Sequence, residues 1–348
     1  MKTLLTVLKY ALLLGISGAL MWYAVRGQDL SRIGHYIRTA NYFWLGLSLV
    51  LSALGYFSRA YRWQMQLEAS QTPATYWQTY HAMMVGYLAN LVLPRAGEVI
   101  RCSVLRRTSG VPVQVALGTV VTERVIDVLV LLGLLTATLA LDFHTFWTFA
   151  NDKLFGGKID ALARNRTPLL LAAIGALVLL AAAGYTLFRN LERLRQHALF
   201  NKAIVFVKGL LAGVFSVVRL KHKWLFLFHT AFTWGVYYLV GYLAFLCFPE
   251  TQGLDTKVAL AVLTFGTFGM AAPVAGGIGP FHVLVQGVLI VYGLSKETGI
   301  AYALVLHGAQ TLLVVLLGGI SFVAVAAHDK GNVLQEAEAL AGEPLTTE

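Results

Sequence analysis

The chain has 348 residues, of which 57% are hydrophobic and only 13% are charged, and its net charge is +10. Soluble globular proteins contain about 25% charged residues, so this composition, with a mean hydropathy of +0.68, excludes a soluble globular fold. We therefore expect an all-α polytopic membrane protein. Cys102 and Cys247 are the only cysteines in the sequence, too few and too far apart for a disulfide framework or a zinc site.

About six apolar stretches are predicted to cross the membrane, since about 20 helical residues span the hydrocarbon core. They are residues 4–25, 42–58, 113–141, 168–188, 224–248 and 299–327. The first is interpreted as an uncleaved helix, because bulky Trp22 and Tyr23 occupy the place of a small-residue cleavage site. Residues 198–218 are also apolar, but Lys208 would then lie near mid-membrane, so an amphipathic helix in the interface is predicted there.

Two further apolar regions are irregular and predict re-entrant helical hairpins. One is residues 75–93, which end at Pro94, and the other is residues 258–293, with MAAPVAGGIGPFH at their centre. The basic loop at 189–223 belongs in the cytoplasm by the positive-inside rule. If 75–93 enters and returns, the arginines of its two flanking loops, 59–74 and 94–112, are also cytoplasmic, together with both termini.

This arrangement predicts an inverted repeat. Span 42–58, a hairpin and span 113–141 are followed by span 224–248, a hairpin and span 299–327 in the opposite orientation. Broken segments in corresponding positions of inverted repeats indicate a transport site near the bilayer midplane. The prediction depends on topology alone, because the two halves share no convincing residue-level identity.

Charged residues follow the first irregular region and begin the next span. They are Arg95, Glu98, Arg101, Glu123, Arg124 and Asp127. The first three are three residues apart, so one helical face could pair them. The six sum to zero charge, and an anionic headgroup could displace a carboxylate because guanidinium binds phosphate in the same bidentate way. The alternative is an ion-pair brace between the hairpin and the span.

The second irregular region contains Gly276, Gly277 and Gly279. Two interpretations stay open: backbone N–H groups at the start of a half-helix could cradle an anion, or the glycines only break the helix. His282 follows the glycines and titrates near neutral pH, which favours a headgroup or proton role.

Three motifs, NLVLPRAGEVIR, TERVID and PVAGGIGPFH, together resemble the lysylphosphatidylglycerol-synthase transmembrane-region family, over roughly residues 10–327. The resemblance implies roles for Asn90, Pro94, Arg95, Gly97, Glu98 and Arg101, for Glu123, Arg124 and Asp127, and for Pro273, Gly276, Gly277 and Gly279. Many relatives have a motif that resembles P-x-P-G-G-x-G, followed shortly by an acidic residue. This chain has Ala275 in the place of the second proline and His282 near the place of the acidic residue. The resemblance implies a flippase-like domain at 1–328 and an acidic cytoplasmic tail at 329–348.

We expect a lipid translocator in the cell membrane, which moves an anionic phospholipid or an isoprenoid-phosphate lipid. One alternative is a membrane-embedded hydrolase or transferase that uses His282 with Glu98 or Asp127 as acid and base. Another is a scaffold for a separately encoded glycosyltransferase. The expected partners are membrane lipids and not nucleic acid, and no cofactor or metal site is predicted.

Overall fold

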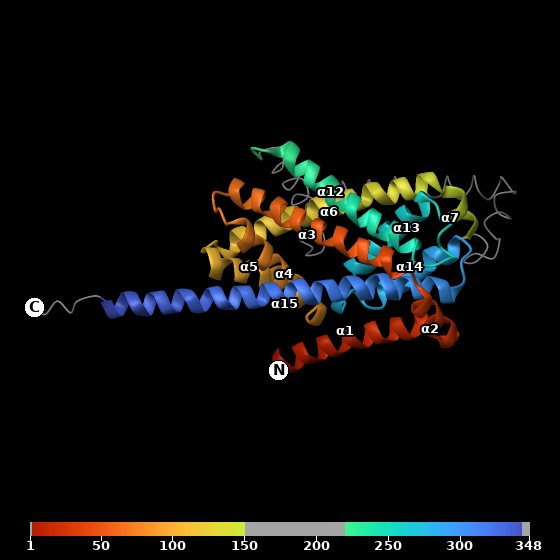
Figure 1. Cartoon of the computed structure of the whole chain (residues 1–348), viewed down its shortest axis with the longest axis horizontal. Coiled ribbons are helices and arrows are strands. Elements are labelled where there is room, and N and C mark those ends of the chain that lie inside the picture. Colours follow the sequence, from red (N-terminus) through yellow and green to blue (C-terminus); the bar gives the residue numbers. More distant parts are fainter. Residues whose placement is uncertain (1, 150–219, 343–348) are drawn as a thin grey trace, which may run out of the picture.

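The computed structural model describes residues 2–149 and 220–342, and the regular elements in this part are helices, with no strand among them (Figure 1). The all-α class is therefore confirmed for the described part of the chain. The predicted span at 168–188 and the predicted interfacial helix at 198–218 lie outside the described residues.

The first part contains α1 (Lys2–Val25), α2 (Leu30–Thr39), α3 (Tyr42–Ala69), α4 (Tyr76–Val92), α5 (Gly97–Ser109), α6 (Val113–Leu141) and α7 (Phe143–Phe149). The second contains α12 (Lys223–Phe245), α13 (Thr256–Ala271), the 3-10 helix η2 (Ala275–Gly277), α14 (Pro280–Val291) and α15 (Lys296–Gly342). Side-chain caps fix several starts, because Asp29, Asn41 and Asp255 accept backbone N–H groups at α2, α3 and α13.

In the described part, three helices are long and apolar enough to cross a membrane: Tyr42–Ala69, Val113–Leu141 and Lys296–Ala327. They contain three of the predicted spans. However, α3 does not end near residue 58 as predicted, and it carries Arg59 and Arg62 as helical residues. The predicted span 224–248 is a helix, α12, but it is not among these three.

The first irregular region is a helical hairpin whose limits differ from the prediction. Residues 76–92 form one continuous helix, and the returning limb is α5, which was expected to be a cytoplasmic loop. Near the base the Gln78 side chain donates to the Thr108 carbonyl oxygen (2.6 Å), so the two limbs are antiparallel. Pro94 therefore lies at the tip of the hairpin and not at its end.

The tip of this hairpin has a defined backbone cause. Proline restricts the preceding residue to extended conformations, and Leu93 has φ −113° and ψ 102°. Arg95 follows with φ +65°, in the left-handed region. These two residues turn the chain, and α5 begins at Gly97.

The second irregular region is also a helical hairpin, formed by α13, η2 and α14. Gly276, Gly277 and Gly279 have φ of +56°, +74° and +97°, which residues with a Cβ rarely adopt, so the helix is broken here. The limbs approach closely, because a Cβ added to Gly269 would lie 2.5 Å from the Phe281 Cα atom.

Helices α3 and α12 pack antiparallel along one another. The Asn41 backbone N–H donates to the Cys247 carbonyl oxygen (2.8 Å) at one end, and Ser58 Oγ lies 2.8 Å from His229 Nδ1 nearer the other. The first hairpin follows the C-terminal end of α3, and the second follows that of α12. The bases of the hairpins therefore lie at opposite ends of this pair (Figure 1).

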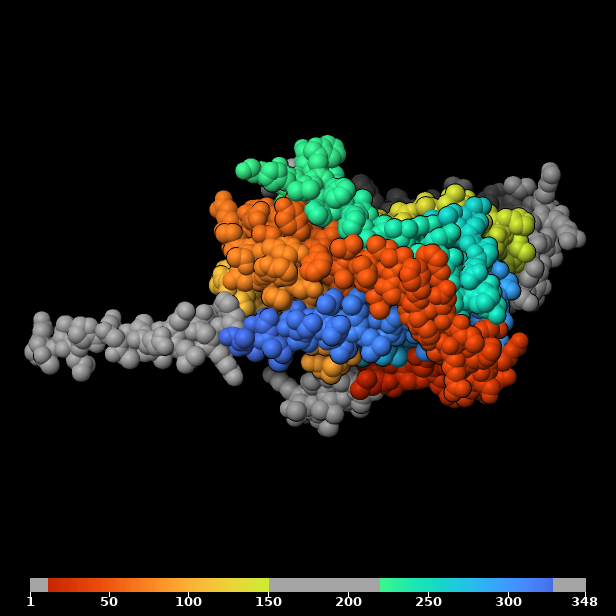
Figure 2. Space-filling view, viewed as in Figure 1, coloured from red at the N-terminus to blue at the C-terminus, as the bar shows by residue number. Residues whose placement is uncertain are grey.

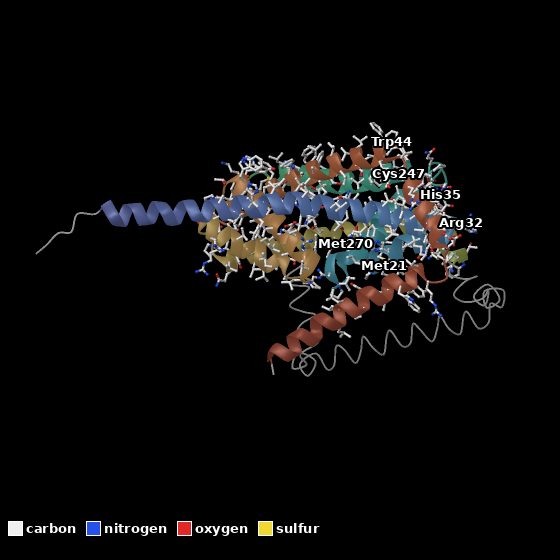
Figure 3. The ribbon with its side chains drawn as sticks, turned by 60° about the horizontal axis from the view of Figure 1, so that its bottom comes forward. Met21, Arg32, His35, Trp44, Cys247 and Met270 are labelled. Carbon is white, nitrogen blue, oxygen red and sulfur yellow. The ribbon has the colours of Figure 1, made fainter. Side chains whose placement is uncertain are left out.

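The tips of the two hairpins meet. The Arg95 guanidinium donates to the carbonyl oxygen of Ala271, and a Cβ added to Gly276 would lie 3.3 Å from the Leu91 side chain. Helix α1 runs along the second tip, where Met21 and Met270 flank the glycine break (Figure 3). Helix α15 packs along α4 and α14, and it lies beside α3 on the face shown in Figure 2.

Candidate functional site

A group of charged side chains is buried where α3, α6 and the α5 limb of the first hairpin meet. Arg59 and Arg62 come from α3, Arg101 from α5, and Glu123 and Asp127 from successive turns of α6. Asp127 is partly exposed, and the other four are less than a tenth exposed. We call these five residues the buried charge cluster.

Glu123 is the centre of the buried charge cluster. Its side chain is 1% exposed, and its oxygens accept from Arg59 (2.5 Å), Arg62 (3.2 Å) and Arg101 (3.0 Å). Asp127, one helical turn further along α6, accepts from Arg62 (3.0 Å). Ionised groups at these depths are retained only when they are paired, so Glu123 holds three helices together.

The buried charge cluster is not electrically neutral, since its three arginines face two carboxylates. Several buried donors also have no hydrogen-bond partner among the described residues: Nε and Nη1 of Arg101, and Nε of Arg59 and of Arg62. A buried excess of positive charge with unpaired N–H donors is costly for an empty site and favours an anion.

Aromatic and hydroxyl side chains surround these arginines. The Arg101 guanidinium lies over the Trp63 ring at 4.6 Å, a cation–π contact. Helix α12 supplies two hydroxyl acceptors, Tyr237 for Arg59 (2.9 Å) and Thr230 for Arg62 (3.3 Å). The second half of the chain therefore contributes polar contacts to a cluster whose charges come from the first half.

Glu98 and Arg124, both predicted site residues, lie at the rim of this cluster. Arg124 Nε is 3.9 Å from Glu98 Oε1, and Arg124 Nη1 is 3.7 Å from Asp127 Oδ2. Arg124 is more than a third exposed. Of the six predicted charges, the structure brings together the five at positions 98, 101, 123, 124 and 127.

The prediction that Arg95 joins this cluster is wrong. A common helical face for residues 95 to 101 requires a helix through them, but Arg95 has φ +65° and α5 begins at Gly97. Arg95 is exposed, and its guanidinium donates to the Ala271 carbonyl oxygen at the end of α13. It therefore joins the tips of the two hairpins. The predicted charge balance of zero fails with it.

Arg59 and Arg62 were not predicted as site residues, because a cytoplasmic loop was predicted at 59–74. The available signal was their spacing of three residues, which continues the helical repeat of the preceding apolar run. Both side chains turn inward toward α6 and are buried.

Asn90, predicted to bind substrate, has a structural partner. Its Oδ1 accepts from the Gly97 backbone N–H (2.8 Å), which satisfies a free donor at the start of α5. Gly97 is required by close packing, since a Cβ there would collide with the Gly86 carbonyl oxygen and with the Asn90 side chain.

In the second hairpin, the glycines break the helix, and three of the backbone N–H groups that could cradle an anion have partners within the chain. The backbone N–H of Gly277 donates to Val274 O (3.4 Å), that of Ile278 to Ala275 O (3.1 Å), and that of Gly279 to His282 Nδ1 (3.4 Å). These donors are therefore already used. Pro273 is exposed between α13 and η2.

His282 is a buried residue of the second hairpin, on α14, and it makes no contact with the acidic residues proposed to work with it. Its ring packs against His307 and Phe281. In the described part of the chain, no hydrogen bond, ion pair or ring contact joins it to Glu98 or Asp127.

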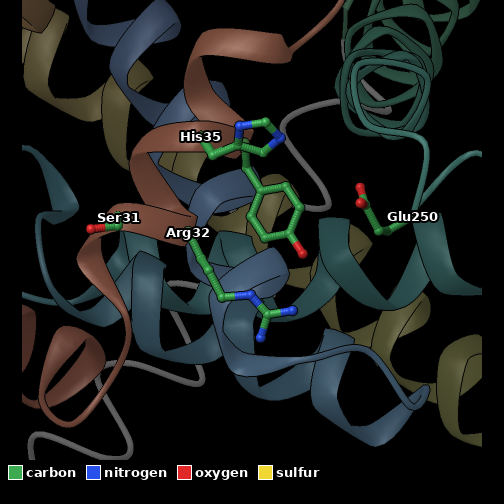
Figure 4. A pocket seen from close by; sticks show the side chains of 5 residues that line it. Ser31, Arg32, His35 and Glu250 are labelled. Atoms are coloured by element: carbon green, nitrogen blue, oxygen red, sulfur yellow. The ribbon is translucent and has the colours of Figure 1, made fainter.

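A separate recess lies at the opposite end of the α3–α12 pair from the base of the first hairpin. It is lined by Ser31, Arg32, His35 and Tyr36 of α2 and by Glu250 after α12 (Figure 4). Arg32 and Glu250 give it charges of both signs. None of the predicted site residues lines it.

The sequence profile of the lysylphosphatidylglycerol synthase TM region matches residues 10–318 of the chain. This match includes both hairpins and every residue of the buried charge cluster. No curated protein and no solved structure matches the chain.

Proposed function

The chain belongs to the lysylphosphatidylglycerol synthase TM region family, and we propose that it is a lipid translocator, which moves an anionic phospholipid or an isoprenoid-phosphate lipid across the cell membrane. The observation that carries this proposal is the excess positive charge of the buried charge cluster. Ionisable residues inside a membrane domain are costly, and they are by default candidates for a substrate or ion pathway.

The phosphate of a lipid headgroup fits the unpaired donors of this cluster. Arg101 Nη1 and Nε have no hydrogen-bond partner among the described residues, whereas Arg101 Nη2 is bound to Glu123. A phosphate that accepts from Arg101 and from Nε of Arg62 compensates the excess charge without breaking the pairs that Glu123 makes. When the headgroup leaves, the carboxylates keep most of the arginine charge paired, so binding is reversible.

The hairpins are proposed to be re-entrant. A helix rises about 1.5 Å per residue, so limbs of 17, 13, 16 and 12 residues are too short for a hydrocarbon core of roughly 30 Å. Each hairpin packs on the long helix that follows it, and each is reached by the long helix of the other half. These matched contacts support an inverted repeat. From the positive-inside rule we also propose cytoplasmic termini, with a lipid path that passes the hairpin tips.

The test is lipid movement in liposomes that contain the purified protein and a headgroup-labelled anionic phospholipid. We expect wild-type protein to expose the inner-leaflet label to a membrane-impermeant quencher. Arg101→Lys should fold but move lipid at least about tenfold more slowly, because lysine keeps the charge and loses the bidentate fork. Arg106→Lys is the matched control, since Arg106 is exposed on the same helix.

Equal rates for Arg101→Lys and wild type would show that the buried charge cluster is a brace and not a binding site. Mass spectrometry of the lipid after the assay tests the enzymatic alternative, because a hydrolase or transferase changes the mass of the headgroup and a translocator does not. Movement of lipid by the purified chain alone would argue against a scaffold that needs a separate glycosyltransferase.

A further inference from the structure

Two buried histidines lie behind the glycine break of the second hairpin. His282 on α14 is 3% exposed and His307 on α15 is 6% exposed. Their ring centroids are 4.9 Å apart, and Phe281 packs against His307 at 4.8 Å. The buried charge cluster uses neither of them.

One of the two rings is bonded to a glycine that breaks the helix. Nδ1 of His282 accepts from the Gly279 backbone N–H (3.4 Å), and the His307 ring packs on the His282 ring. Gly279 has φ +97°, a value that residues with a Cβ rarely adopt. The His282 imidazole, supported by His307, therefore holds the backbone at a position where the second hairpin has conformational freedom.

No counter-charge reaches this pair in the described residues. No ion pair joins either ring to a carboxylate among the described residues, and their ring contacts are with Phe281 and with each other. Three ionisable groups on neighbouring elements have other partners: Arg26 lies over the Trp22 ring, Arg95 donates to the Ala271 carbonyl oxygen, and Lys257 is near Asp142. His144 is exposed, and Lys296 and Glu297 lie at the start of α15. An imidazolium here would be buried without a partner, so the structure holds both rings neutral.

We propose that His282 and His307 form a proton-binding site that couples opening of the second hairpin to uptake of a proton. The inference rests on the proposed function, because this site would supply the proton that drives lipid movement. A proton added at His282 Nδ1 occupies the lone pair that accepts from Gly279, so this hydrogen bond is lost. The charged ring then repels any charge on His307 and is stable only where water reaches it.

The proton therefore binds the open hairpin more strongly than the closed one. By linkage, acid shifts the population toward the open state, and closing returns the proton to water. In the open state each ring is expected to titrate near the ordinary histidine pKa of about 6.5. Opening by a single proton can change by up to about tenfold per pH unit.

Opening of the second hairpin is tested without lipid transport, by a spin label placed at the glycine break. Ile278→Cys is introduced where Cys102 and Cys247, both buried, are replaced by alanine, and the label's collision rate with a water-soluble nickel relaxant is measured. The pH is lowered from one unit above to one unit below the ordinary histidine pKa of about 6.5. We expect accessibility to rise several-fold and reversibly, and to stay constant in His282→Gln/His307→Gln.

His81→Gln is the control, because His81 packs on Ser321 and lies outside the second hairpin. An unchanged pH response in the double glutamine variant, or no response in wild type, would overturn the proposal. If the accessibility of the spin label rises in acid but no lipid moves, the proton site stands and the proposed function fails. If lipid moves at a rate that pH does not change, the proposed function stands and the proton site fails.

Discussion

The two hairpins have the same plan, but they use opposite chemistry. The first turns at Pro94 and Arg95 and supplies Arg101 to the buried charge cluster. The second turns through three glycines, and the two buried histidines behind this turn have no acidic or basic partner among the described residues. We propose that the first hairpin holds an anion and that the second changes its backbone, so mutations are expected to separate binding from movement.

The largest effect should come from the centre of the charged side. Glu123→Ala leaves Arg59, Arg62 and Arg101 facing Asp127 alone, and breaking a buried pair in this way costs about 3–5 kcal/mol. We expect a sharply lower thermal unfolding midpoint in detergent and a poor yield. Glu98→Gln, at the rim, is the control and should unfold near the wild-type temperature. A stable Glu123→Ala protein would mean that the cluster is open to water.

The next effect tests the close packing of the first hairpin. A Cβ at Gly97 would meet the Gly86 carbonyl oxygen, so Gly97→Ala should destabilise the protein by about 1–3 kcal/mol through overpacking. Gly133→Ala on α6, with open space around it, should be neutral or slightly stabilising. Thermal unfolding in detergent compares the two, and equal midpoints would contradict the tight crossing of α4 and α5.

An effect of similar size in the second hairpin sharpens the separation between binding and movement. Gly277 has φ +74° beside Met270, so Gly277→Val should strain the second break by about 1–3 kcal/mol and slow lipid movement by about tenfold. Affinity for a phosphate headgroup, measured by calorimetry with short-chain lipid, should stay unchanged. Loss of affinity together with rate would show that the hairpins do not divide these tasks. Gly133→Val is the control.

The smallest effect should be at the rim. Arg124 and Glu98 are partly exposed and 3.9 Å apart, and such pairs contribute about 0.2–1 kcal/mol. A double-mutant cycle with Arg124→Gln and Glu98→Gln should give a coupling energy in this range, and weaker at high salt. A coupling energy above this range would mean that Arg124 and Glu98 belong to the buried charge cluster.

The sequence allowed prediction of the helical class, both breaks and five of the six clustered charges, because proline, glycine and helical spacing are local signals. It failed for Arg95, since a single positive φ value ended the assumed helical face. It failed for Arg59 and Arg62 because a charge at the end of an apolar run is as consistent with a loop as with a continuing helix. The contact between the hairpin tips joins residues 176 positions apart, which no local pattern specifies.

The source of the ion pairs has a consequence for how the chain is made. Each arginine–carboxylate contact of the buried charge cluster lies within α3, α5 and α6, and α12 adds only the hydroxyl groups of Thr230 and Tyr237. A growing chain can therefore neutralise most of these charges while α12 is still in the ribosome. In that order of events, the arginines would be paired before the first half enters the lipid, and the second half would dock against a preformed surface.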